Sequence, residues 1–401
     1  MTGDAVILTL NGGSSSIKFA LFAARTSLVR LASGAVDGIG SANPQLKMAG
    51  QPAKVAVTAT DHKGAGEIVF AEAERQIAGR RLIAIGHRIV QGGQDFVHPQ
   101  LIGPEMLDAL RQLGPLDPEH LPNELALVAA ATRRFRSVRQ IACFDTAFHH
   151  SMPRVAKLIA IPLRYASRGV IRYGFHGLSY AYLLGEVERL DGTATSRSRI
   201  VMAHLGGGAS LAAVNGGQPI DTSMGFTPAS GVPMGTRCGD IDPGLSAYLA
   251  RTEAMSIAAF DHMANFESGL LGLSETSADM RELLEREAHD PRAADAVSLF
   301  CYAIKQRIGA FAATLGGIDL LVFTGGIGAN APVIRARICD GLEFLGIAVD
   351  AGRNVVSATI VSPDNGTVVV RVLQTDEEIM IARSARDLLA DTPEPATAAY
   401  E

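Results

Sequence analysis

The amino-acid sequence predicts an α/β protein with two domains, and three observations lead to this expectation. The chain has 401 residues, which is too long for one ordinary hydrophobic core. Hydrophobic residues make up 47% of it and charged residues 19%, the balance of a well-packed globular protein. Segments with strand patterning alternate with segments of helical periodicity, which is typical of α/β folds.

Strands are expected at 5–10, 17–22, 82–90 and 140–144, and helices at 104–112 and 123–134. A second strand–turn–strand pattern begins at Ile200 and closes in a hairpin at Asn215-Gly216. The longest helix is predicted over 291–315, where Gly316-Gly317 ends it. A buried strand at 319–324, a glycine loop, a helix opening near Pro332 and a last helix from about Asp376 complete the expected order, and the tail after it is expected to fray.

One pattern occurs twice. LNGGSSSIKFALF near the start and HLGGGASLAAV near residue 204 both read as strand, glycine-rich turn, small hydroxyl residue and strand. Two related half-molecules, each presenting a tight turn to a shared cleft, would explain the repeat. Glycine hairpins are common, however, so spacing alone leaves chance equally open.

Composition excludes several classes of function. The formal net charge is −5 and only six residues are Lys, so we expect no nucleic-acid partner and no membrane-surface binding. The first residues lack the basic region and cleavage site of a signal peptide, and no apolar run reaches 18 residues. The four cysteines are far apart and form no CxxC pair. These features favour the reducing cytoplasm.

Glycine-rich turns are the first candidates for phosphate binding. No Gly-Lys pair occurs in the sequence, so the usual P-loop is absent. Turns at Gly12-Gly13 and at 206–208 could instead bring backbone N–H groups close to a phosphate. Ser14, Ser16 and Lys18 add hydroxyls and a charge beside the first turn. An ordinary solvent-facing hairpin is the alternative.

The segment GIGANA at 326–331 resembles a dinucleotide-binding fingerprint. It follows a predicted buried strand and precedes a helix, and Asp350 is expected to end a further strand about 20 residues on. Taken alone, it would indicate an NAD-dependent oxidoreductase. Its late position in the chain argues against this, as does its failure to explain the polar clusters elsewhere.

Polar residues recur between apolar strands in four segments: GHRIVQGG with His87 and Arg88, FDTAFHH with Asp145, RYGFHGLSY with Arg172 and His176, and MGTRCGDIDP with Arg237, Asp240 and Asp242. Any one of them could be a surface ion pair or a satisfied core group. Their recurrence at strand ends favours a site, because ligands of α/β sheets collect at the carboxyl ends of strands.

In this order, NGGSSSIK, GHRIVQGG, FDTAFH, RYGFHG, HLGGGAS, DTSMGFTP, MGTRCGDIDP, FTGGIGAN and TDEE resemble the motifs of acetate kinases nearly end to end. Each motif is weak, but nine in order are very specific. The resemblance implies two ribonuclease-H-like domains of the acetate and sugar kinase, Hsp70 and actin superfamily around a central nucleotide cleft. It implies a first domain of 1–147 completed by a C-terminal helix at 379–401, a second, nucleotide-binding domain of 148–378, and a homodimer.

The same resemblance implies reversible transfer of the ATP γ-phosphate to acetate, giving acetyl phosphate and ADP for acetyl-CoA biosynthesis. Mg²⁺ would assist, with Mn²⁺ able to substitute. Expected catalytic residues are Asp145, His176 and Arg237. Expected acceptor-binding residues are Arg88, Val90, Phe175 and Pro228, and expected metal-associated residues are Asn11 and Glu377. Expected nucleotide-binding residues are Ser14, Ser16, Lys18, His204, Leu205, Gly206, Gly207, Gly208, Asp279, Met280, Arg281, Gly326, Ile327, Gly328, Ala329 and Asn330.

The sequence departs from the family pattern at several of its motifs. The replaced positions are Gln91, Leu178, Tyr180, Gly207 and Ala329. The largest departure is Glu119, which takes the place of an apolar pocket leucine. Either it turns away and pairs with a cation, which we favour, or the pocket admits another acceptor. Propionate or another short carboxylate is therefore the first alternative, and a non-catalytic nucleotide-binding protein is a further one.

Overall fold

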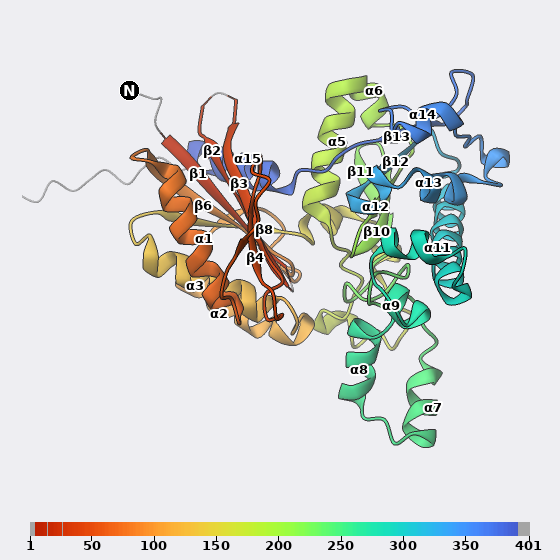
Figure 1. Ribbon diagram of the computed structural model, residues 1–401, viewed down its shortest axis with the longest axis horizontal. Helices are drawn as coiled ribbons and strands as arrows, with labels where there is room; N and C mark the ends of the chain where they lie inside the picture. Colours follow the sequence, from red (N-terminus) through yellow and green to blue (C-terminus); the bar gives the residue numbers. More distant parts are fainter. Residues whose placement is uncertain (1–4, 14, 26, 392–401) are drawn as a thin grey trace, which may run out of the picture. The chain divides into compact units, whose positions relative to one another are not determined.

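The structure, a computed structural model, describes residues 5–13, 15–25 and 27–391 (Figure 1). The chain divides into two compact units. Unit 1 comprises Met1–Ala147 and Asp376–Glu401, and unit 2 comprises Phe148–Thr375. The second boundary lies three residues earlier than the sequence suggests. The reason is that the last helix begins at Glu377 and packs on strands of unit 1, so Glu377 belongs to unit 1.

Unit 1 is built on an eight-stranded sheet of order β5-β4-β3-β2-β1-β6-β8-β7, in which β1, β6 and β8 run parallel. Its strands are β1 (Ala5–Gly12), β2 (Ser16–Ala23), β3 (Val29–Asp37), β4 (Gln45–Met48), β5 (Val55–Ala56), β6 (Arg81–Ile89), β7 (Gln100–Leu101) and β8 (Arg139–Phe144). Its α-helices are α1 (His62–Ile77), α2 (Pro104–Gln112), α3 (Leu121–Arg134) and α15 (Glu377–Asp391), with a short 3₁₀ turn at Gly114–Leu116.

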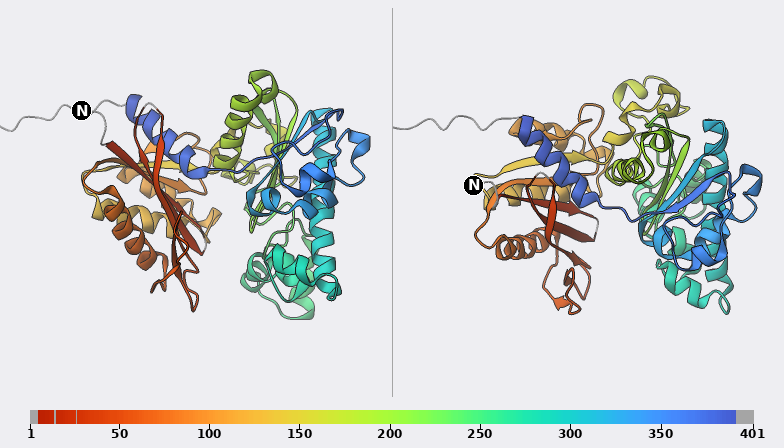
Figure 2. Two further views of the ribbon diagram at one scale, coloured as in Figure 1. Left: turned by 45° about the horizontal axis from the view of Figure 1, so that its top comes forward. Right: turned by 90° about the horizontal axis from the view of Figure 1, so that it is seen from above.

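Helices cover both faces of this sheet. Val6, Leu8 and Leu10 of β1 lie in one core with residues of α1 and α3, because alternate residues of a strand point to the same face. On β6, Ile85 belongs to that core while its neighbour Gly86 faces α15. A Cβ on Gly86 would lie 2.4 Å from Cγ2 of Ile381, so glycine lets α15 approach closely. Figure 2 shows α15 lying along the sheet.

Unit 2 is built on a five-stranded sheet of order β11-β10-β9-β12-β13. Its strands are β9 (Ile200–Leu205), β10 (Ala209–Asn215), β11 (Gln218–Thr222), β12 (Leu320–Thr324) and β13 (Val369–Val372). Its α-helices are α4 (Arg154–Lys157), α5 (Gly177–Asp191), α6 (Thr193–Ser196), α7 (Gly244–Thr252), α8 (Ile257–Phe266), α9 (Gly269–Ser274), α10 (Met280–Arg286), α11 (Pro291–Leu315), α12 (Gly325–Asn330), α13 (Pro332–Cys339) and α14 (Ala351–Val355). Short 3₁₀ turns lie at Ala147–Ser151, Ala166–Arg168 and Glu343–Leu345.

The two longest helices of unit 2 lie on opposite sides of its sheet (Figure 1). Tyr180, Leu183 and Val187 of α5 share a core with residues of β9, β10 and β12, and α11 packs against β10 and β11. The bounds of α11 match the prediction, because each end carries a clear signal. Asp290 caps the first turn by accepting the N–H of Arg292, and Gly316 ends the helix at φ 71°.

The two sheets share one topology. In each, the first strand pairs antiparallel with the second strand and parallel with a later one, as β1 does with β2 and β6, and β9 with β10 and β12. The third strand, β3 or β11, extends the antiparallel side, and β8 or β13 extends the parallel side. The repeated sequence pattern therefore marks structurally equivalent hairpins.

Two local predictions are wrong. The glycine segment after β12 is the short helix α12 rather than a loop, because Gly325 at φ 80° turns the chain directly into helical geometry. Asp350 ends no strand; its side chain accepts the N–H of Arg353 and so caps α14. The strand needed to complete a dinucleotide fingerprint is therefore missing, and this argues against the oxidoreductase alternative.

Candidate active site

In unit 1, three predicted residues gather where the parallel strands β1, β6 and β8 end. Asn11 is the second-last residue of β1, Arg88 the second-last of β6, and Asp145 follows β8 directly. Parallel strands bring their carboxyl ends to one edge of a sheet, so these side chains meet there.

Arg88 and Asp145 form a buried ion pair. Nε and Nη2 of Arg88 donate to Oδ2 of Asp145 at 3.0 and 2.6 Å, and Nη1 donates to the carbonyl of Gly12 at 3.1 Å. Burial lowers the pKa of Arg88, but the carboxylates of Asp145, Glu377 and Glu124 outweigh it and leave that pKa raised. Arg88 is thus a fixed cation, and a bound carboxylate would have to share its guanidinium with Asp145.

The residues expected near a metal also lie together. The amide nitrogen of Asn11 donates to Oε2 of Glu377 at 2.8 Å and to Oε1 of Glu378 at 3.3 Å. These contacts join the end of β1 to the first turn of α15 and orient the amide of Asn11, which is 6% exposed. Amide and carboxylate oxygens are donors that suit Mg²⁺. No group of three or more His, Cys, Asp or Glu able to hold a metal occurs in the described part of the chain, but Mg²⁺ commonly takes few protein ligands.

The first glycine turn can be followed only in part. Ser14 lies outside the described residues. The carbonyl of Ser16 accepts the N–H of Gly13 at 2.7 Å, and Lys18 is exposed and paired in register with Asn11 across β1 and β2. His87 is not part of this edge. It is buried, its Nε2 bonds Oε1 of Gln140 at 2.7 Å, and burial lowers its pKa to about 4.

Glu124 is a site neighbour that sequence reasoning missed. It lies in the first turn of α3 and is 4% exposed, and its Oε2 accepts the backbone N–H of Val90 at 2.9 Å. The signal that could have found it is a third acidic residue within DPEHLPNE, just before an apolar helix. Asp117 is buried in the same segment, where its Oδ1 accepts from Nδ1 of His120 at 2.9 Å.

Glu119 does not behave as favoured from the sequence. Its side chain is half-buried in the turn before α3, and among the described residues it forms no ion pair. Its backbone carbonyl accepts from the amide of Asn123, which holds the turn. Val90, the predicted pocket residue nearest in sequence to Arg88, is 2% exposed. Gln91, another departure from the family, is buried and accepts the N–H of Gly93.

In unit 2, the predicted histidine His176 sits at the start of α5 in a left-handed conformation, at φ 59°. A non-glycine residue rarely adopts this backbone, and such strain is concentrated at functional sites. Nδ1 of His176 bonds Oγ of Ser210 at 2.9 Å, and the hydroxyl of Tyr180 bonds the same Oγ at 2.6 Å. The ring of His176 stacks on that of His204, with centroids 4.3 Å apart. Nδ1 of His204 in turn bonds Ser179 at 2.8 Å.

The second glycine turn brings His176 and Arg237 together. A Cβ on Gly208 would lie 3.4 Å from Nε2 of His176 and 3.7 Å from Nη1 of Arg237. Nη1 of Arg237 also lies 3.4 Å from the carbonyl oxygen of Pro228. Both predicted catalytic residues of unit 2 therefore border the turn at 206–208, where glycine leaves the backbone open to a ligand.

The remaining acceptor-pocket candidate of unit 2 is Phe175, which is 1% exposed and whose carbonyl accepts from Nε2 of His149. Burial also lowers the pKa of His149 to about 4. Arg172, singled out from the sequence, bonds Asp221 at 2.9 Å and the carbonyl of Ala156 at 2.8 Å. Arg172 and Asp221 therefore form a structural ion pair that links the loop before α5 to β11.

The other predicted nucleotide segments border the same turn. The N–H of Gly206 donates to the carbonyl of Gly208, and the N–H of Gly235 donates to the carbonyl of Gly207. A Cβ on Gly206 would lie 3.7 Å from the nitrogen of Gly326, which places the start of α12 beside the turn. Within α12, Ile327 is half-buried and Ala329 is 1% exposed, while the amide of Asn330 donates to the carbonyl of Gly326.

The segment 279–281 opens α10. Asp279 caps that helix by accepting the N–H of Arg281, and it also pairs with the Arg281 guanidinium at 2.5 Å, which lowers the pKa of Asp279. Met280 is buried, whereas 86% of the Arg281 side chain is exposed. A Cβ on Gly235 would lie 3.2 Å from the carbonyl of Gly207 and 3.5 Å from that of Ala278, so this segment reaches the turn through Gly235.

Arg335 of α13 is a fully buried arginine that the sequence did not single out. Its five N–H donors are all used: Nε binds Oδ1 of Asn354, Nη1 binds the carbonyls of Gly328 and Ala329, and Nη2 binds the carbonyl of Asn354 and Oγ of Ser357, at 2.8 to 3.0 Å. Burial lowers its pKa. Arg335 thus holds the last carbonyls of α12 and fixes that helix.

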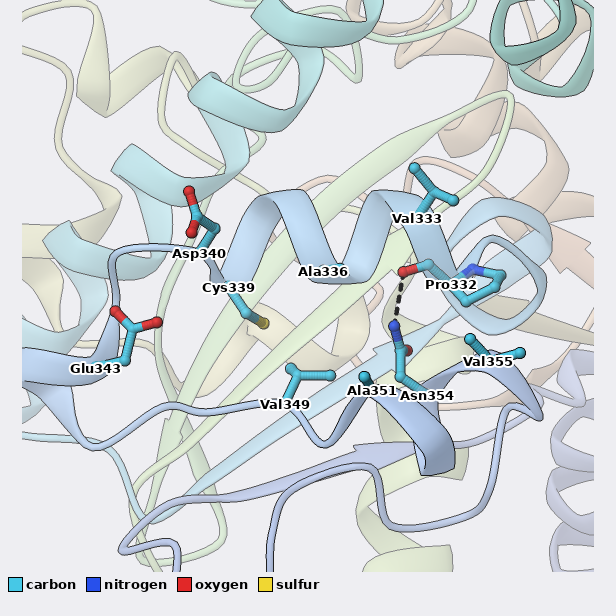
Figure 3. A pocket seen from close by; sticks show the side chains of 10 residues that line it. All are labelled: Pro332, Val333, Ala336, Cys339, Asp340, Glu343, Val349, Ala351, Asn354 and Val355. Carbon is cyan, nitrogen blue, oxygen red and sulfur yellow. Dashed lines mark hydrogen bonds between the residues drawn. The ribbon is translucent and has the colours of Figure 1, made fainter.

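A pocket of about 340 Å³ lies between α13 and the segment 343–355 (Figure 3). Its walls are mainly apolar, with Val333, Val349 and Val355 among them, and the carboxylates of Asp340 and Glu343 stand at one end. The amide of Asn354 donates to the carbonyl of Pro332 across it. None of the predicted site residues lines this pocket, which is separate from the turn at 206–208.

Two α/β sheets of the same topology carry polar clusters at their strand ends. One cluster is rich in acidic side chains and the other is a glycine turn with a histidine and an arginine, and this combination suits a phosphotransferase. The sequence profile of the Acetokinase family matches residues 6–383, and the chain belongs to this family.

Individual relatives agree. The acetate kinase of Rhodopseudomonas palustris (strain TIE-1) is 41% identical over 388 residues, which cover 94% of this chain and 97% of that protein. The propionate kinase of Citrobacter rodentium is 39% identical over 404 residues, covering 98% and 99%. The crystal structure of Porphyromonas gingivalis acetate kinase superposes with a TM-score of 0.86 at 36% identity, covering 96% of this chain and 100% of that one. The predicted family, fold class and enzyme class, a kinase that phosphorylates a carboxyl group, are confirmed.

Proposed function

We propose that the chain catalyses reversible transfer of the ATP γ-phosphoryl group to acetate, giving acetyl phosphate and ADP. The observation that carries this proposal is the chemistry of the two strand-end clusters. Unit 1 offers a fixed guanidinium, Arg88, for the acceptor carboxylate. Unit 2 offers His176 and Arg237 beside a glycine turn suited to phosphate.

The reaction needs charge neutralisation more than proton transfer. The acceptor carboxylate is already ionised at neutral pH, so it requires hardly any general base. The difficulty is bringing it against the anionic γ-phosphate. Arg88 would orient the acceptor, and Arg237 and His176 would stabilise the charge spread over the phosphoryl oxygens in the transition state. Asp145, which binds two N–H groups of Arg88, is then an orienting residue rather than a proton acceptor.

Asn11 and Glu377 would hold Mg²⁺, or Mn²⁺ in its place, through their oxygen atoms. When bound, the ion would neutralise phosphate charge. The nucleotide would contact Ser14, Ser16 and Lys18 of the first turn, residues 204–208, Asp279 to Arg281, and residues 326–330. Gly207 and Ala329 each carry less polar chemistry than the family residues, so ATP is expected to bind mainly through backbone donors.

A hydroxamate assay for acyl phosphate tests the proposal directly. Purified protein with ATP, Mg²⁺ and acetate should form acetyl phosphate, and leaving out acetate should abolish the signal. Absence of product at saturating acetate and propionate would reject a carboxylate kinase. A thermal shift with ATP and Mg²⁺ but none with NAD⁺ would separate this function from the oxidoreductase alternative.

Propionate kinase is the second candidate, and two observations favour keeping it. A propionate kinase is among the relatives, and Glu119 replaces an apolar pocket residue without finding a cation partner among the described residues. Relative kcat/KM for acetate, propionate and butyrate decides between them, because one methylene group changes specificity by about 10- to 200-fold.

We further propose a homodimer formed through α7 and α8. No residue of α7 is buried and only Ala264 of α8 is, while Leu245, Tyr248 and Ile257 are exposed, Ile257 by 89%. Such an apolar surface is typical of a protein interface. Light scattering should give twice the 42.1 kDa chain mass, and a Tyr248→Glu, Ile257→Glu variant should give the monomer.

We place the enzyme in the cytoplasm, where acetyl phosphate would supply acetyl-CoA synthesis. Four free thiols suit a reducing compartment. No helix of the described residues has the length and apolar character needed to cross a membrane. Cell fractionation with an antibody against the chain checks this location.

A further inference from the structure

Glu124 connects three parts of the acceptor edge in unit 1. It sits in the first turn of α3, and its Oε2 fixes the backbone N–H of Val90 just beyond β6. Its Cγ also lies close to the first glycine turn, because a Cβ on Gly12 would be 3.8 Å from it. Gly12 is the residue whose carbonyl binds Arg88. Glu124 therefore binds the backbone two residues after Arg88 and lies near the residue whose carbonyl binds the Arg88 guanidinium.

The second oxygen of Glu124 has an unusual environment. Oε1 is buried and has no hydrogen-bond partner among the described residues. An ionised carboxylate buried with one hydrogen bond is costly, whereas the protonated acid is not charged and loses much less on burial. Burial raises the pKa of Glu124 to about 8, although Arg88 and the Val90 N–H act in the opposite direction.

The charges that face Glu124 come from each element packed around it. Arg88 stands on β6, Asp145 follows β8, and Asp117 precedes α3, where it bonds His120. Glu377 of α15 also acts on Arg88. Arg88 already binds Asp145 directly. A second ionised carboxylate beside the same guanidinium would repel an incoming acceptor anion, because like charges at close range interact strongly away from water.

We propose that Glu124 is a positioning residue that works as a neutral carboxylic acid, fixing the Val90 backbone while leaving the charge of Arg88 to the acceptor carboxylate. This inference rests on the proposed function. It also defines the acceptor as an anion whose binding weakens once Glu124 ionises.

The test is the pH dependence of KM for acetate at saturating ATP and Mg²⁺. For the wild type, KM should be constant below about pH 8 and then rise about tenfold per pH unit, with a smaller change in kcat. Glu124→Gln, which keeps the shape but cannot ionise, should hold a low KM throughout. Glu72→Gln is the matched control: Glu72 is another buried glutamate of unit 1, bonded to Arg75 on α1, and its replacement should leave the rise intact.

A second readout does not need turnover. The infrared carbonyl band of a protonated carboxylic acid should be present in the wild type at neutral pH, disappear as pH passes about 8, and be missing in Glu124→Gln. The titration of this band in the wild type stands even if the variant does not fold.

A Glu124→Gln enzyme that keeps the wild-type rise in KM, or a wild type without the protonated band, would overturn the inference. A wild type that forms no acyl phosphate would instead refute the proposed function, and the band would still report the state of Glu124.

Discussion

The two units place opposite chemistry on the same topology. In unit 1, the edge formed by β1, β6 and β8 carries the acidic side chains of Asp145, Glu124 and Glu377 around one guanidinium. In unit 2, the turn between β9 and β10 carries backbone groups, His176 and Arg237. Equivalent hairpins therefore border an acidic edge in one unit and a glycine turn with a histidine and an arginine in the other.

The difference teaches that topology fixes where a site lies, while side chains fix what it binds. A carboxylate-rich edge suits a metal ion and an acceptor held by a single arginine. A glycine turn with a histidine and an arginine suits phosphate. Each substitution below changes one residue of one unit. Its effect on kinetics or stability should match the chemistry proposed for that unit.

Arg237→Ala should have the largest effect. Losing an arginine that stabilises the transferring phosphoryl group costs about three or more powers of ten in kcat, with little change in unfolding temperature. Steady-state kinetics with acetate measures it. Arg189→Ala, at an exposed arginine of the same unit paired with Glu186, should keep full activity. Near-normal turnover of Arg237→Ala would contradict this difference between the units, because it would show that unit 2 does not need the charge of Arg237.

Arg335→Met tests the support of α12. The carbonyls of Gly328 and Ala329 would lose their buried donor, so stability should fall by about 2–3 kcal/mol and KM for ATP should rise more than KM for acetate. Denaturant titration and kinetics measure the two effects. Arg337→Met, two residues on at a half-exposed pair with Glu287, should cost less than about 1 kcal/mol. Equal losses in the two variants would show that the buried hydrogen bonds of Arg335 to α12 are unimportant.

Gly86→Ala tests the docking of α15. The added Cβ would overlap Ile381, and overpacking of this kind costs about 1–3 kcal/mol. Because Glu377 opens α15, the half-saturating concentration of Mg²⁺ should also increase. Gly185→Ala on α5, where a Cβ meets no atom within 4 Å, should be neutral or stabilise by up to about 1 kcal/mol. An unchanged half-saturating concentration of Mg²⁺ in Gly86→Ala would show that the position of α15 does not affect metal binding.

Tyr180→Phe should have the smallest effect. It removes the hydroxyl that bonds Ser210, which in turn bonds His176. The loss of one buried hydrogen bond is worth about 1 kcal/mol, so kcat should fall less than tenfold while KM for acetate stays constant. Tyr302→Phe, an exposed tyrosine of α11, is the control. A change confined to KM for acetate would show that Tyr180 acts on the acceptor and does not act on the phosphoryl group through His176.

The sequence predicted well those features that are encoded locally. The bounds of α11 follow from Asp290, Pro291 and Gly316, and the two hairpins follow from glycine turns between apolar strands. The local sequence predicted a wrong secondary structure where tertiary contacts determine the backbone conformation. Segment 325–330 is helical because Gly325 turns at a point where a Cβ would lie 2.5 Å from the carbonyl of Leu205, and no short pattern contains that contact.

Long-range partners were the least predictable part of the site. Motifs identified Arg88, Asp145 and Glu377, but not that Asn11 would bond Glu377 across 366 positions of sequence. Glu124 and Arg335 belong to no quoted motif, and only burial distinguishes them from surface charges. The roles of the motif residues in catalysis stay predictions until the variants are measured.

The split of unit 1 has a consequence for how the protein is made. The ribosome completes β8 and then synthesises all of unit 2 before α15. Until then, the sheet face at Gly86 is not covered by α15, whose residues Ile381 and Ala385 pack near Gly86 in the complete chain. A nascent chain stalled before Asp376 should therefore expose apolar surface and recruit chaperones, although its second unit already holds all of its own strands.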